Sequence, residues 1–153
     1  MEDLIKYIGV VSVVLVIIGW LVIYKNARKI ATRGETKSLI DDVIKILYDI
    51  EELSVAYWLS GRKGRIDSEE FLLLFNAKLL TLNSRLEILK DRKINVEVVD
   101  LADISECITF HCEDVDRIQS TEKRERVQTF LDTINAANEK LYKEFQKLHK
   151  PVY

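Results

Sequence analysis

The densest group of side chains that can do chemistry lies in residues 106–114, which hold two cysteines, one histidine and three carboxylates. Cys107 and His111 are four residues apart, so on a helix they lie on one face and can share a Zn²⁺ ion. A zinc site needs three or four ligands, but the segment has no Cys-x-x-Cys pair and His149 is the only other histidine. We therefore predict no metal and no cofactor. Cys112 is expected to pack as a small apolar residue, and His111 to be a partnered core or boundary residue.

Motifs for catalysis are missing from the sequence. It has no G-x-S-x-G, no G-x-x-x-x-G-K-[ST] and no H-E-x-x-H. Neighbouring carboxylates such as Asp41 and Asp42 diverge on a helix, so they do not form an acid–base pair. We predict that the chain is not an enzyme. A diffuse site containing His111 with a perturbed pKa is the alternative.

Charge is balanced, with one compact positive loop. The net charge is −2 and the two signs are interspersed, which argues against a nucleic-acid-binding protein. The loop over residues 61–65 holds two glycines and three cations, Arg62, Lys63 and Arg65. Its backbone amides and cations can hold an anion or contact a partner. The alternative is a loop that contacts only solvent. If the preceding helix of about 24 residues stands upright, the loop lies roughly 36 Å from the membrane, and a soluble partner is favoured over lipid.

A run of eighteen uncharged residues, from Tyr7 to Tyr24, dominates the N-terminus. As a helix it rises about 27 Å, close to the roughly 30 Å of a bilayer's hydrocarbon core. Tyr7 lies at one end and Trp20 and Tyr24 near the other, as in the aromatic belts of membrane proteins. A cleaved signal peptide would have a shorter apolar region after a basic start. We predict a retained single-pass signal-anchor; a buried core helix is the alternative.

Orientation follows from the basic residues beside the span. Lys25, Arg28, Lys29 and Arg33 follow it, whereas Lys6 alone precedes it. The basic flank stays in the cytoplasm, so we predict the N-terminus outside and the C-terminal domain inside. The same side chains can contact lipid headgroups. The span itself holds no Asp, Glu, Lys, Arg or His, so it is expected to anchor the chain in the lipid bilayer and not to conduct ions.

The rest of the chain is predicted to be all-α. Residues 1–33 form the anchor with its basic flank, and residues 34–153 a cytosolic four-helix bundle or pair of coiled helical hairpins. Apolar spacing of three and four predicts helices over about 36–59, from 67, over 100–119 and over 120–150.

Several local features refine this prediction. Gly34 is expected to break or bend the chain between the span and the helix over 36–59, with a continuous helix as the alternative. Asp67 is expected to cap the second helix, and Ser120 or Thr121 the fourth. Residues 91–100 are expected to be an extended linker or helix start, since no partner strand is visible. Tyr57 and Trp58 are expected in the core. We find no clear internal repeat.

Two functions of different class fit this organisation. The first is a membrane-anchored interaction or regulatory module that recruits, or oligomerises with, a protein partner. The second is a small membrane-acting effector of toxin or defence type, in which the bundle senses a signal and clustered spans perturb the membrane. Depolarisation of cells that depends on residues 7–24 discriminates between them.

Overall fold

The computed structural model describes the backbone of residues 2–150 and the side chains of residues 11–150, and this part of the chain is all-helical. Its α-helices are α1 (Glu2–Leu59), α2 (Ser68–Asp91), α3 (Leu101–Thr109) and α4 (Ser120–Leu148), with a short 3₁₀ helix, η1 (Cys112–Asp114), between the last two. The chain divides into two compact units, Met1–Thr36 and Lys37–Tyr153. We call the second unit the helical domain.

The N-terminal unit consists of the first part of α1. Apolar side chains from Val11 to Tyr24 are exposed on every side of this helix, including Trp20 at 76% and Tyr24 at 64%. In the described chain, α1 is the one helix that is long and apolar enough to cross a membrane. The predicted belt residue Tyr7 lies outside the residues whose side chains are described.

The predicted break at Gly34 is wrong, and the alternative of a continuous helix is confirmed, since α1 runs through this residue to Leu59. A single glycine costs a helix only about 1 kcal/mol, and no proline follows to stop it. Thr32 and Thr36 donate their hydroxyls to the carbonyls of Arg28 and Thr32, at 2.9 and 2.8 Å. Such bonds weaken or bend a helix without ending it.

The start of α2 follows the sequence pattern, whereas the start of α4 does not. Asp67 accepts a hydrogen bond from the Glu70 amide at 2.7 Å, so the predicted cap is confirmed. In α4 the capping position falls on Gln119, whose side chain makes no capping bond, so neither Ser120 nor Thr121 is the cap. Residues 92–100 form turns and extended linker without strand.

The third helix is much shorter than predicted. Asp100 caps α3 by accepting from the amides of Ala102 and Asp103 at 3.0 Å, but the helix ends at Thr109. His111 then takes a left-handed conformation, with φ of 57°, which a right-handed helix cannot contain. The apolar spacing hides this break, because the turns that follow still bury Cys112 and Val115.

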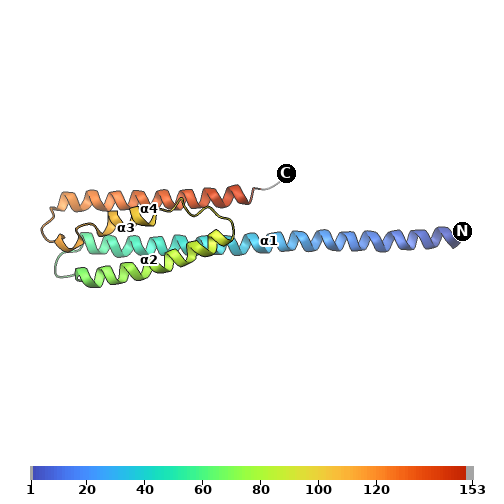
Figure 1. Ribbon diagram of the computed structural model, residues 1–153, viewed down its shortest axis with the longest axis horizontal. Coiled ribbons are helices and arrows are strands. Elements are labelled where there is room, and N and C mark those ends of the chain that lie inside the picture. Colours follow the sequence, from blue (N-terminus) through green and yellow to red (C-terminus); the bar gives the residue numbers. More distant parts are fainter. Residues whose placement is uncertain (1, 151–153) are drawn as a thin grey trace. The chain divides into compact units, whose positions relative to one another are not determined.

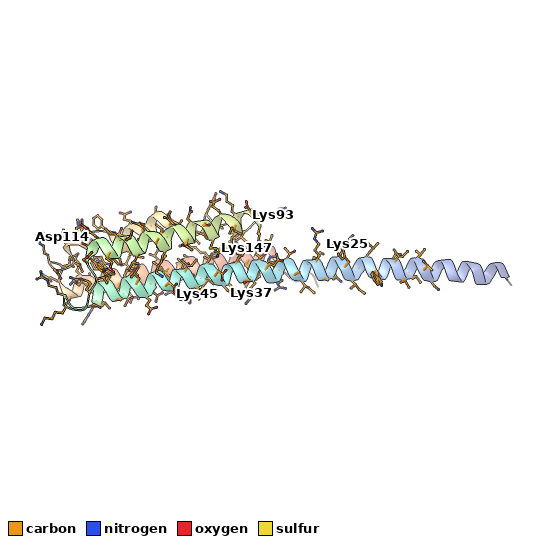
Figure 2. All side chains as sticks on the ribbon, turned by 90° about the horizontal axis from the view of Figure 1, so that it is seen from below. Lys25, Lys37, Lys45, Lys93, Asp114 and Lys147 are labelled. Atoms are coloured by element: carbon orange, nitrogen blue, oxygen red, sulfur yellow. The ribbon has the colours of Figure 1, made fainter. Side chains whose placement is uncertain are left out.

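One hydrophobic core holds the helical domain together, and every helix contributes to it. Figure 1 shows α2 running back along the Lys37–Leu59 part of α1, with α3 beside α4. The largest fully buried side chains are aromatic or branched and come from all four helices: Trp58, Tyr57, Phe71, Phe75, Phe130, Ile40, Leu47, Ile50, Leu82, Leu89, Ile104 and Ile108. Lys93 and Asp114 mark opposite ends of the domain in Figure 2. Tyr57, Trp58 and Phe71 are in contact at the Asp114 end, which we call the loop end.

Candidate functional site

The loop end is built around Tyr57 and Trp58, which are 2% and 0% exposed, as the sequence predicted. The Tyr57 hydroxyl donates to the Cys112 carbonyl at 2.7 Å, and Trp58 Nε1 donates to the Ile108 carbonyl at 3.0 Å. The Tyr57 ring also stacks on Phe71, with centroids 3.9 Å apart. Burial raises the pKa of the Tyr57 phenol to about 12, so the hydroxyl keeps its proton and remains a donor. These bonds tie the last turn of α1 to the end of α3 and to η1.

Two of the three cations of the positive loop form ion pairs within the protein. Arg65 pairs with Asp116, lies 5.5 Å from the centroid of the Tyr57 ring, and has only 6% of its side chain exposed. Arg62 is 86% exposed and its Nε lies 3.6 Å from the same carboxylate. The hydrogen bond from Arg65 holds the pKa of Asp116 below its ordinary value. Lys63 is exposed at the tip of the loop, so an anion or partner contact here falls mainly to Lys63 and Arg62.

The hollow beside this loop is not suited to a free anion. It has a volume of about 280 Å³ and is lined by Tyr57, Arg62 and Arg65 but also by three carboxylates, Asp67, Glu113 and Asp116. These carboxylates outnumber the two arginines. The local charge is therefore negative, and Arg62 and Arg65 serve as ion-pair partners of Asp116 and not as an anion site.

Cys107 and His111 do not share a helix face, because α3 ends at Thr109, so the expected common face is wrong. Cys107 is half-buried on α3 and its thiol donates to the Ile104 carbonyl at 3.3 Å. His111 lies beyond the helix end, exposed, with its ring 4.0 Å from that of Phe110, so the expected core or boundary position is also wrong. Cys112 is 1% exposed and packs in the core as predicted. Among the described residues, no group of three or more His, Cys, Asp or Glu is placed to hold a metal.

Burial also sets the chemistry of the two thiols. It raises the pKa of Cys107 and of Cys112 to about 11 in each case. A thiol with such a pKa is almost wholly protonated at neutral pH and is a poor nucleophile. Neither cysteine is therefore poised for covalent catalysis.

Arg126 is the residue of this end that the sequence analysis missed. Its guanidinium donates to the Phe110 carbonyl at 2.6 Å, pairs with Glu122 at 3.2 Å, and lies 5.3 Å from the centroid of the Trp58 ring. Its spacing was the available signal, because it stands four residues before the buried Phe130 and so lies on the apolar side of α4.

A groove runs between α3 and α4, formed by two adjoining hollows of about 420 and 550 Å³ that share Asp103 and Thr129. We call it the α3–α4 groove. Phe110, 52% exposed, forms part of its wall. Its cations are Arg126, which is paired with Glu122, and Lys140. Its carboxylates are Asp100, Asp103, Glu106, Glu122, Glu125 and Asp132. The groove is therefore strongly acidic and partly apolar.

The basic flank of the N-terminal unit lies on one side of its helix. Lys25, Arg28, Lys29 and Arg33 are all exposed. At about 100° per residue they fall within an arc of roughly 140°. Lys25 projects from α1 in Figure 2. Four exposed cations within nine residues after the apolar stretch can contact anionic lipid headgroups.

Comparison of the chain with protein-family models, with curated proteins and with solved structures gave no match.

Proposed function

We propose that this protein is a single-span, membrane-anchored module whose helical domain lies in the cytoplasm and binds a protein partner. The observation that carries the proposal is the exposed apolar surface of α1 between Val11 and Tyr24. Ten Val, Leu and Ile side chains lie in this stretch. Each gains about 1.5–3 kcal/mol on leaving water, so together they favour lipid by more than a typical domain's whole stability of about 5–15 kcal/mol.

The basic flank supports the proposed orientation. Its four cations follow the apolar stretch directly, on one side of the helix, where they can pair with anionic headgroups of the inner leaflet at about 1 kcal/mol each. A bilayer retains such a flank on the cytoplasmic side. The helical domain follows the flank in the chain and therefore lies on that side as well.

We assign partner binding to the α3–α4 groove. Six carboxylates line it against two cations, and Phe110 offers an apolar contact within it. A cationic, amphipathic segment of a cytosolic protein matches this combination in charge and in hydrophobicity.

Site-specific photo-crosslinking in native membranes tests the assignment. A photoreactive residue at Thr129, inside the groove, should give an adduct with another protein, whereas the same residue at Asn135, exposed elsewhere on α4, should not. Asp103→Lys together with Glu106→Lys should abolish the adduct. Equal adducts at both positions, or an adduct that survives the two charge reversals, would refute the groove as the binding surface.

The alternative of a membrane-acting effector makes a different prediction for the same cells. Residues 11–24 contain no Asp, Glu, Lys, Arg or His, so clustered spans offer no charged lining for an aqueous pore. Expression should therefore leave a potential-sensitive dye unchanged. Prompt depolarisation that requires the apolar stretch would favour the effector over the module.

A further inference from the structure

The outward face of α2 carries the most exposed large apolar side chains of the helical domain. Leu73 and Leu80 are each 71% exposed, and Leu74 is 41% exposed. Leu73 and Leu80 lie one above the other on α2, because seven residues make almost two helical turns. Exposed apolar side chains that line up on one surface mark a contact surface more often than isolated ones do.

This face is part of a short repeat that the sequence analysis did not detect. Residues 73–79 read LLFNAKL and residues 80–86 read LTLNSRL, so the same or a similar residue recurs at six of the seven positions. Burial shows what the repeat does. The third and seventh positions of each copy face the core, whereas the first, fourth and fifth are exposed. Both copies of the repeat therefore have the same outward surface as well as the same core surface.

The outward surface has no charge over the length of the repeat. Between Glu70 and Glu87 the only charged residues are Lys78 and Arg85, which are both half-buried at the side of the helix. Lys78 is moreover directed to Asp49 of α1, at 3.5 Å. Solvent-facing surfaces of helices normally carry charged side chains, so their absence here requires an explanation.

We propose that two copies of this chain pack through this face, which we call the α2 seam, with their α2 helices parallel and in register. The α2 seam consists of Leu73, Asn76, Ala77, Leu80, Asn83 and Ser84. The proposal rests on the proposed membrane anchor. Identical chains inserted in one membrane from the same side are related by an axis along the membrane normal, so helices that run along this normal point in the same direction in both copies.

The chemistry of the α2 seam suits an identical partner. Leu73, Asn76, Leu80 and Asn83 alternate three and four apart, which is the spacing of a coiled-coil contact. In register, leucine meets leucine, and each asparagine amide, which both donates and accepts, meets an identical amide. The small residues beside them, Ala77 and Ser84, allow close approach. Because the seam is neutral, an identical copy brings no like charges together within it.

The seam is short, which predicts a weak association that needs the membrane. From Leu73 to Asn83 the helix rises roughly 15 Å. Glu69 and Glu87 continue the spacing at its two ends, where identical copies would bring like charges together. Confinement to one membrane raises the effective concentration of the second copy and allows such a small contact to be populated.

Cysteine crosslinking of the full chain in native membranes tests the α2 seam. Leu73→Cys and Leu80→Cys, treated with a short bis-maleimide, should each give at least tenfold more homodimer than Asn135→Cys, an exposed position on α4. The unsubstituted chain measures the background from Cys107 and Cys112. Equal dimer at all three positions, or a main product containing a different protein, would overturn the proposal.

Charge variants give an independent readout that does not depend on crosslinking chemistry. Leu73→Glu with Leu80→Glu should abolish energy transfer between fluorescently labelled copies, while the thermal midpoint stays unchanged because both positions are exposed. Glu87→Gln, which removes a like-charge contact at the end of the seam, should increase the transfer. Unchanged transfer in both variants would contradict the seam. If the unsubstituted chain stays in the membrane fraction but does not pair, only this inference fails; if it leaves that fraction, the proposed anchor fails.

Discussion

Removal of the Tyr57 hydroxyl tests how the loop end is held together. In Tyr57→Phe the ring still stacks on Phe71, but the Cys112 carbonyl loses the donor that lies 2.7 Å away in a buried position. The Cys112 carbonyl still accepts from the Val115 amide at 3.3 Å, so the change removes one buried hydrogen bond, which costs about 0.5–1.5 kcal/mol. For a domain of this size, 1 kcal/mol lowers the melting temperature by roughly 4 °C, so the expected decrease is about 2–6 °C.

The assay is thermal unfolding of the full chain in detergent, followed by circular dichroism. Tyr48→Phe is the matched control, since it makes the same change on the same helix at a side chain that is 52% exposed. The control should change the unfolding free energy by less than about 0.5 kcal/mol. If Tyr57→Phe melts within 1–2 °C of Tyr48→Phe, roughly the scale of such a surface change, the hydrogen bond does not stabilise the domain and the description of the loop end is wrong.

Three further predictions concern other parts of the chain. Pairing with Arg65 lowers the pKa of Asp116, so the stability that this carboxylate contributes is present above its ordinary pKa of 3.8 and is lost as the pH falls through the lowered value. The difference in unfolding free energy between the wild type and Asp116→Asn should therefore shrink below about pH 4. A difference that grows there would contradict the pairing. Cys112, which is 1% exposed, should resist iodoacetamide at pH 8 until the domain unfolds, whereas the half-buried Cys107 should react earlier. Mass spectrometry of partially labelled protein gives the order of labelling. Faster labelling of Cys112 would contradict its place in the core. Gly34→Ala places a methyl group where no atom lies within 4 Å, so it should stabilise α1 by up to about 1 kcal/mol. Amide hydrogen exchange over residues 30–38 should become slower. Faster exchange there would mean that α1 is not continuous.

Apolar spacing predicted the core well, because the side chains that fill it recur every three or four residues along α1, α2 and α4. The same spacing failed in residues 100–119. There Ile104, Ile108, Cys112 and Val115 are all buried, although His111 breaks the helix between them. A single left-handed residue that is not glycine leaves no signal in the sequence, so the length of α3 was not predictable from it.

The candidate site was less predictable than the core, since its contacts join residues far apart in the chain. The sequence marked Arg65 as an exposed cation, but its partner Asp116 lies 51 residues away. Arg126 likewise looks like part of a mixed surface run until Phe110 and Trp58 are brought against it. The acidic groove combines side chains of α3 and α4, and neither helix carries enough of them alone to attract notice.

The proposed function adds a consistent set of roles to these parts. The anchor holds the chain in the membrane, the α3–α4 groove is acidic where a cationic partner would bind, and the α2 seam is neutral where a second copy would pack. The groove and the seam involve different helices, so a charge reversal in one should leave the other intact. Partner crosslinking at Thr129 should therefore persist in the Leu73→Glu, Leu80→Glu variant unless binding requires pairing.

Extraction of cell membranes with alkaline carbonate tests the central proposal, a membrane-spanning α1, most directly. The full chain should remain in the pellet, whereas Leu15→Arg with Ile18→Arg, which adds about 2.5–3.5 kcal/mol of insertion cost per residue, should move it towards the supernatant. Both positions are more than half exposed on α1, so the substitutions disturb no packing in the helical domain. Release of the unsubstituted chain by carbonate would contradict the membrane-spanning helix and with it the proposed function.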